Sequence, residues 1–220
     1  FFLSYLVKMM TNSLDLAEFV PATVLTGTGK EYPLTVRATD EELFLSYTTP
    51  VKFPNKVEGN RDYTGVLPRF VAKTERTFEV LGLLQAEMGK TMNGNLSFSN
   101  CEPKIINYVL NWFHDHHLLQ NDSWRWSIKL NLREPENAAF RQCLDQPRVS
   151  YWLEHTPITF EQAYPKKVTY FSGSRQETLK DLNHGTLVLE YRNNLFSQII
   201  KHLVKKITYE TIFTCERSLI

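Results

Sequence analysis

The hydrophobic and polar positions along the chain follow two periods, one typical of helices and one typical of strands. Apolar residues at three- and four-residue intervals predict helices over 75–87, 103–119, within 136–156 with a break near Pro147, and over 195–207. Alternating apolar and polar residues, or short β-branched runs, predict strands over 95–100, 124–133, 166–173 and 185–193. The expected order is therefore helix, strand, helix, strand, helix, strand, strand, helix.

The N-terminal part of the chain has a different pattern. Residues 21–58 contain short Thr-, Val-, Tyr- and Phe-rich runs broken by Gly and Pro, which predicts a small β-rich region. Residues 60–73 hold Gly65 and Pro68 and are predicted to be a connector, after which Thr74 caps a helix. We therefore expect an α+β protein with an N-terminal extension and connector over 1–70 and a second domain over 71–220.

Composition places the chain among globular proteins. Of its 220 residues, 42% are hydrophobic and 22% charged, with 9 Gly and 10 Pro, which excludes disordered and collagen-like classes. Every apolar run is far shorter than the ~20 residues of a membrane helix, so no membrane association is expected. Cys101, Cys143 and Cys215 are widely spaced, which argues against a disulfide framework and favours an intracellular setting of unknown compartment.

Charge is nearly balanced, so a polyanionic partner needs support from the arrangement of the charges. Residues 1–120 carry 11 Lys and Arg against 13 Asp and Glu, and residues 121–220 carry 14 against 11. Lys and Arg neutralise phosphates, while Arg, Asn and Gln read base edges in the major groove. The polar positions of the predicted strands, with nearby basic residues, are therefore expected to contact DNA: Asn95, Ser97, Ser99, Arg125, Ser127, Lys129, Asn131, Arg133, Arg175 and Arg192. The alternative is a solvated sheet face, and Trp124 and Trp126 are expected in the core behind it.

The segment VLGLLQAEMG, residues 80–89, resembles the signature helix of LAGLIDADG homing endonucleases. Gly82, Leu83, Ala86 and Glu87 match the glycine, leucine, second alanine and last acidic residue of that motif. The resemblance continues through the predicted strands and helices to about residue 210. It implies a saddle-shaped, curved antiparallel sheet backed by helices, and a site-specific double-stranded DNA endonuclease encoded by an intron or intein.

The chemistry of the motif can be stated from its residues. Small side chains at Gly82 and Ala86 permit close approach of a partner helix, so both are predicted in a helix interface. The negative end of the helix dipole disfavours the Glu87 carboxylate, and a divalent cation would relieve this. With a second acid from a partner helix, Glu87 would hold Mg²⁺ for metal-dependent phosphodiester hydrolysis. Lys90 or the pair Lys166 and Lys167 is predicted to stabilise charge on the phosphate. The alternative is a core helix with an incidental terminal Glu.

The chain departs from the family pattern at one position and carries one motif only. Met88 occupies the place of the usual final glycine, and Gly89 follows it. The second half of the site is expected from a homodimer or from sequence beyond Ile220, since residues 209–220 resemble the start of another helix with Thr214 as its cap.

The sequence also allows other functions and other sites. Met88 favours a non-cleaving relative, a maturase or a transcriptional regulator, and the small net charge allows an interaction domain with no nucleic acid. His114, His116 and His117 point in different directions from a helix, which argues against zinc binding. Gly27 to Lys30 lacks the spacing of a phosphate-binding loop and is expected to be a turn.

Overall fold

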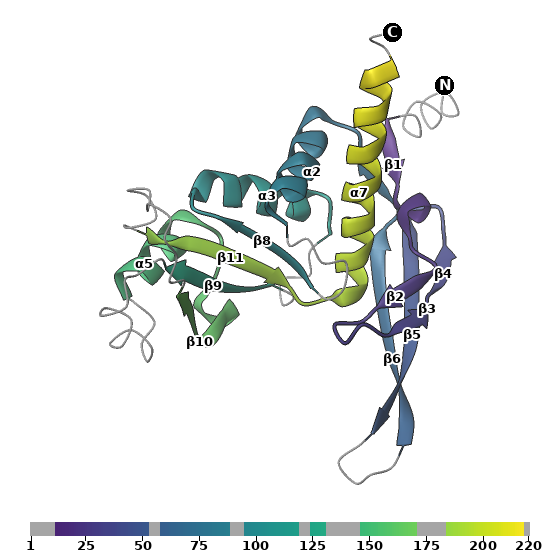
Figure 1. Cartoon of the computed structure of the whole chain (residues 1–220), viewed down its shortest axis with the longest axis horizontal. Coiled ribbons are helices and arrows are strands. Elements are labelled where there is room, and N and C mark those ends of the chain that lie inside the picture. The colour runs from purple at the N-terminus through teal and green to yellow at the C-terminus, as the bar shows by residue number, and fades with distance from the viewer. Residues whose placement is uncertain are drawn as a thin grey trace.

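The structure, a computed structural model, describes residues 12–52, 58–88, 95–118, 124–130, 146–170 and 184–217. At 52, 130, 146, 160, 163–170 and 208–217 it describes the backbone alone. The N-terminal strands lie on one side of a long C-terminal helix, and a four-stranded sheet with its helices lies on the other (Figure 1). This confirms the predicted α+β class.

The N-terminal region is built from short strands and one long hairpin. Its elements are β1 (Ser13–Asp15), η1 (Leu16–Phe19), β2 (Thr23–Leu25), β3 (Glu31–Pro33), β4 (Thr35–Ala38), β5 (Glu42–Lys52), β6 (Glu58–Pro68) and β7 (Phe70–Ala72). β5 pairs with β6 over its full length, β4 pairs with β5, and β7 pairs with β1. The predicted connector over residues 60–73 is therefore wrong. Gly65 lies within β6 where another side chain approaches closely, and Pro68 ends the strand, so neither marks a loop.

The remaining elements follow the predicted order. They are α2 (Glu75–Glu87), β8 (Leu96–Asn100), α3 (Pro103–Asp115), β9 (Trp124–Leu130), α5 (Gln146–His155), η3 (Phe160–Gln162), β10 (Ala163–Tyr170), β11 (Thr186–Tyr191) and α7 (Asn194–Arg217). Thr74 caps α2 as predicted, accepting a hydrogen bond from the Thr77 amide at 3.2 Å. The helix predicted within residues 136–156 is described from Gln146 to His155, with Pro147 in its first turn, where its missing N–H costs nothing. Residues 136–145, on the other side of the predicted break, lie outside the described residues.

The four-stranded sheet has the order β10-β9-β11-β8. β11 runs antiparallel to both of its neighbours, whereas β10 runs parallel to β9. The sheet is therefore mixed, because the strand at one edge is parallel to its neighbour. The prediction of a fully antiparallel sheet is wrong at that edge. A parallel neighbour requires a long crossover, and the chain segment that contains α5 connects β9 to β10.

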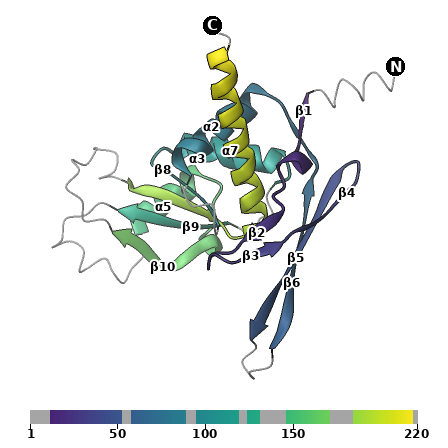
Figure 2. The same ribbon diagram turned by 45° about the vertical axis from the view of Figure 1, so that its right-hand side comes forward.

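Helix α7 holds the two halves of the chain together (Figure 2). Its first turns are buried, and Phe196 packs against the hairpin at Gly65 while Gln198 accepts a hydrogen bond from the Leu25 amide at 2.9 Å. Buried residues of the N-terminal strands and of the sheet form one continuous hydrophobic cluster. Among the described helices, none is long and apolar enough to cross a membrane.

The C-terminal end of α7 corrects a further expectation. Residues 194–217 form one helix, so Thr214 lies within it and does not cap a new helix. Gly and Pro are the residues that most disfavour a helix, and the sequence after Ile207 contains neither. The predicted end near residue 207 therefore came too early.

We expect Gly65→Ala to destabilise the protein by roughly 1–3 kcal/mol through overpacking. A Cβ on Gly65 would lie 2.6 Å from Cε1 of Phe196, whose ring is 2% exposed and packs beside Tyr191, so it cannot move aside freely. Gly27→Ala is the control, because no atom lies within 4 Å of a Cβ there. In urea denaturation, the midpoint concentration should be lower for Gly65→Ala than for the parent, and unchanged for Gly27→Ala. Equal midpoints in the two variants would mean that the hairpin does not pack against α7 as described.

Candidate nucleic-acid interface and acidic helix end

Alternate positions of the four-stranded sheet form the predicted polar face, except that the buried Val188 lies at its centre, between Ser99 and Ser127. Across its rows, Glu190 on β11 pairs with both Ser97 on β8 and Arg125 on β9, and Thr186 pairs with Lys129. Side chains alternate between the two faces of a sheet. The opposite face is buried against the helices and consists of Leu96, Phe98, Trp124, Trp126, Ile128, Leu187, Leu189 and Tyr191. Phe113 of α3 contacts Trp124 there, with an edge-to-face ring distance of 5.6 Å.

The polar face is accessible to different degrees along its length. Ser97, Ser99, Arg125 and Lys129 are partly exposed, whereas Ser127 is only 8% exposed. One Arg125 amino group donates to the carbonyl of its neighbour Trp124 at 3.0 Å. A partner that lies on this face therefore meets Arg125 and Lys129 more readily than Ser127.

A carboxylate in the middle of this face was missed from the sequence. Glu190 lies directly opposite Arg125 on the neighbouring strand. Opposite charges in such a pair stabilise a sheet by roughly 0.2–1 kcal/mol. The alternation of apolar and polar residues over 186–191 was the signal that could have placed Glu190 on this face. The negative charge of Glu190 reduces the attraction of this row of residues for phosphates.

The other predicted DNA contacts are distributed as follows. Asn95 is exposed immediately before β8, and Arg192 is exposed immediately after β11. Three more, Asn131, Arg133 and Arg175, lie outside the described residues, as does the predicted catalytic residue Lys90.

Helix α2 has one buried and one exposed side. Thr77, Val80, Leu81 and Leu84 are buried against the rest of the protein. Gly82 and Ala86 are exposed, and no atom lies within 4 Å of a Cβ placed on Gly82. Phe78, one helical turn before Gly82, is 45% exposed. The helix thus presents an apolar side with space above its glycine, where the backbone of another helix has room to approach.

Glu87 is the last residue of α2, as predicted, and it is exposed. Met88 follows it with extended backbone, φ −73° and ψ 144°, and forms an antiparallel bridge with Phe98. Any residue adopts this conformation, so the usual glycine is not required at Met88. Since Ser97 and Ser99 flank Phe98 on the polar side of β8, the bridge brings the Glu87 end of α2 to the edge of the polar face.

Lys166 and Lys167 belong to the strand at one edge of the sheet, and Glu87 lies next to the strand at the opposite edge. They belong to β10, and the strand order separates β10 from β8 by three strand spacings, about 14 Å in total. Within one chain, the structure therefore does not bring these lysines and Glu87 to one phosphate.

Glu87 offers a hard oxygen donor of the kind that a divalent cation prefers. Across the described residues, no group of three or more His, Cys, Asp or Glu side chains is arranged to hold a metal ion. A carboxylate oxygen suits Mg²⁺, yet one carboxylate is not enough to retain it. A site of this kind fits the residues only if a partner helix adds its own acid.

The histidines near α3 have structural contacts. His116 stacks on Trp112 at 5.0 Å, and its Nδ1 lies 3.1 Å from the Trp112 carbonyl oxygen. Burial lowers the pKa of His116. The His114 side chain is mostly exposed, and its Nδ1 lies 3.6 Å from Oδ1 of Asp115.

A buried lysine lies behind the start of β8. Lys201 of α7 is 1% exposed and donates to the Asn95 carbonyl at 3.0 Å. Burial lowers the pKa of Lys201 to about 8. Its position among isoleucines and valines of α7 gave no sign of this contact in the sequence.

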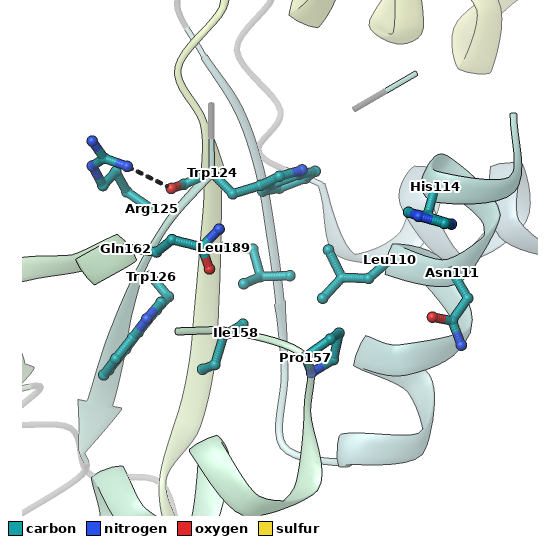
Figure 3. A pocket seen from close by; sticks show the side chains of 10 residues that line it. All are labelled: Leu110, Asn111, His114, Trp124, Arg125, Trp126, Pro157, Ile158, Gln162 and Leu189. Carbon is teal, nitrogen blue, oxygen red and sulfur yellow. Dashed lines mark hydrogen bonds between the residues drawn. The ribbon is translucent and has the colours of Figure 1, made fainter. Parts of the chain in front are cut away.

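A small cavity of about 120 Å³ lies on the helix-covered side of the sheet (Figure 3). Leu110 and His114 of α3, Trp124 and Trp126 of β9, and Ile158 are among its lining residues. The indole nitrogen of Trp124 is buried and has no hydrogen-bond partner among the residues that the structure describes. Arg125 also lines the cavity, so the cavity reaches the predicted DNA contacts at that one residue.

We expect Gly82→Leu to leave the fold of a single chain intact and to weaken pairing through α2 by roughly 1–3 kcal/mol. The space above Gly82 is open in one chain and would be filled by the partner helix in a pair. Lys104→Leu places the same side chain on the exposed side of α3 and serves as the control. Sedimentation equilibrium should show weaker association for Gly82→Leu only. A dimer that tolerates Gly82→Leu would locate the contact elsewhere.

Comparisons of the chain with known protein families, characterised proteins and solved structures found no match.

Proposed function

We propose that the chain is one half of a site-specific double-stranded DNA endonuclease of the LAGLIDADG type. The observation that carries this proposal is the Met88–Phe98 bridge, because it joins the acidic end of α2 to the edge of the polar sheet face. The second half would come from another copy of the chain or from a second motif in a longer protein. Two polar faces side by side would form the saddle on which the duplex lies.

The roles of the residues follow from their positions. Arg125 and Lys129 contact phosphates and fix the duplex on the sheet, while Ser97 and Ser99 face the bases near the acidic end of α2. Glu87 and its counterpart from the partner helix hold Mg²⁺ at the edge of the sheet. The cation, when bound, stabilises the charge that develops on the phosphate as water cleaves the phosphodiester.

The second candidate is a related protein that binds nucleic acid without cutting it. The separation of Lys166 and Lys167 from Glu87 favours it, because these two lysines were expected to stabilise the phosphate and β10 lies at the opposite edge of the sheet. In that case the polar face would keep its role, and the protein would act in RNA splicing or in transcription.

Binding of DNA through the polar face should depend steeply on salt. Each phosphate neutralised contributes about 0.9 to the slope of log affinity against log salt. The double change Arg125→Ala, Lys129→Ala should lower that slope by up to about 1.8, as measured by fluorescence anisotropy with duplexes selected from a randomised pool. The control is Lys73→Ala, Lys104→Ala, which removes two exposed charges outside the four-stranded sheet. Equal slopes for both double variants would remove the polar face from the interface.

Glu87→Gln separates the endonuclease from the binding protein. The amide lacks the negative charge that a hard cation requires, so Mg²⁺-dependent cleavage should be lost. Affinity for DNA in EDTA should remain nearly unchanged, because the phosphate contacts come from the strands. Gln85→Asn, an exposed change in the same helix turn, should preserve cleavage. A parent that binds its selected duplex but never cuts it with Mg²⁺ or Mn²⁺ supports the second candidate, and cleavage by Glu87→Gln at the parent rate contradicts the assigned role of Glu87.

A further inference from the structure

The β5–β6 hairpin extends beyond the part of the chain that packs on α7. Leu43, Leu45 and Leu67 at its base are buried, and so are Tyr47 and Thr49 further along β5, whereas β6 is exposed from Asn60 to Thr64. The hairpin projects in the direction opposite to the C-terminal end of α7 (Figures 1 and 2). From Tyr47 to Lys52, at about 3.4 Å per residue, the projecting part is roughly 17–20 Å long. We call residues 47–52 and 58–64 the arm.

The two faces of the arm differ in charge. Pairing of Tyr47 with Tyr63 and of Thr49 with Arg61 places these residues on one face. That face continues the buried base of the hairpin and carries no carboxylate in either strand. The carboxylates of the hairpin, Glu42, Glu58 and Asp62, are at the alternate positions and belong to the opposite face, where Lys52 is the one basic position. An anion is therefore attracted to one face of the arm and repelled from the other.

The acid-free face is already ordered for binding. The rings of Tyr47 and Tyr63 stack at 4.8 Å, and the Arg61 guanidinium lies 5.4 Å from the Tyr63 ring centroid. An arginine held over a ring loses less freedom on contact with a ligand than one that moves freely in solvent. Tyr63 is 36% exposed, so a part of this residue remains accessible beside Tyr47 and Arg61.

This face leads directly to the end of the four-stranded sheet. A hollow of about 310 Å³ lies at the junction, lined by Tyr47, Tyr63, Arg192 and Asn194 among others. Arg192 immediately follows the last residue of β11, and Asn194 is the hydrogen-bond partner of Tyr47. The first amides of α7 are capped by the Asn193 side chain at 3.1 and 3.2 Å, so the attraction for an anion comes from the arginines.

We propose that the arm is a second DNA-binding element, which holds the phosphate backbone of the duplex beyond the segment that lies on the sheet. The inference rests on the proposed function, because it assumes a duplex on the polar face. A duplex that runs past the end of β11 meets Arg192 first, then Tyr63 and Arg61. The length of the arm corresponds to about half a turn of B-DNA, or about five base pairs.

The test uses the full chain and a duplex selected from a randomised pool, either whole or trimmed by about five base pairs at one end or the other. Arg61→Ala should weaken binding of the whole duplex roughly two- to fivefold and lower the salt slope by about 0.9. On the duplex trimmed at the arm end, it should have no effect. Arg37→Ala is the matched control, since Arg37 also lies over a ring, that of Phe44 at 4.4 Å, but on the opposite face of the same small sheet.

The outcomes distinguish this inference from the proposed function. Equal effects of Arg61→Ala and Arg37→Ala on DNA affinity, with binding still dependent on Arg125 and Lys129, would overturn the role of the arm and leave the proposed function in place. A parent that binds no duplex would overturn both. Binding of polyglutamate that depends on Arg61, without any effect of Arg61→Ala on DNA, would assign the arm to an acidic protein partner and overturn the inference. Thermal melting of each variant checks that the fold is retained.

Discussion

The arrangement of the described elements depends on two pairs of polar side chains in the first turns of α7, of which Ser197, Gln198 and Lys201 are buried. Ser197 and Lys201, one turn apart, bond to the two backbone groups that begin β8: Ser197 accepts from the Leu96 amide at 2.9 Å, and Lys201 donates to the Asn95 carbonyl. Asn194 and Gln198, also one turn apart, donate to the Leu25 carbonyl of β2. Leaving a buried group of this kind without its partner costs about 1–3 kcal/mol. The helix therefore fixes the N-terminal strands and the four-stranded sheet to each other through directional bonds, in addition to apolar contacts.

This constraint decides which surfaces remain open. Because α7 is covered by β2 and β6 on one side and by α2 and β8 on the other, the hairpin leaves the body next to the end of β11. The same packing uses the buried side of α2 and leaves Phe78, Gly82 and Ala86 exposed. The polar sheet face, the arm and the open side of α2 are thus consequences of how one helix is buried.

The sequence predicted what depends on local periodicity. The order of elements after residue 74, the cap at Thr74, the buried face of β9 and the position of Glu87 follow from patterns within one element. The failures concern contacts between distant segments. Gly65 suggests a turn until Phe196, far along the chain, is known to cover it, and Lys201 suggests a surface residue until its carbonyl partner at Asn95 is known. Glu190 was visible in the alternation of β11, but its effect on the face depends on the register that sets it opposite Arg125.

The chemistry proposed for α2 couples pairing to cation binding. Two α2 helices that meet at Gly82 bring two Glu87 carboxylates together, each at the negative end of its own helix dipole. Without a cation these charges repel, and the apolar contact made by Phe78 has to overcome that repulsion. With a divalent cation between them, the same charges favour the pair. By linkage, a cation that stabilises the pair must also bind more tightly to the pair than to a single chain. In the proposed pair, each chain would present one exposed acid and contribute half of a metal site.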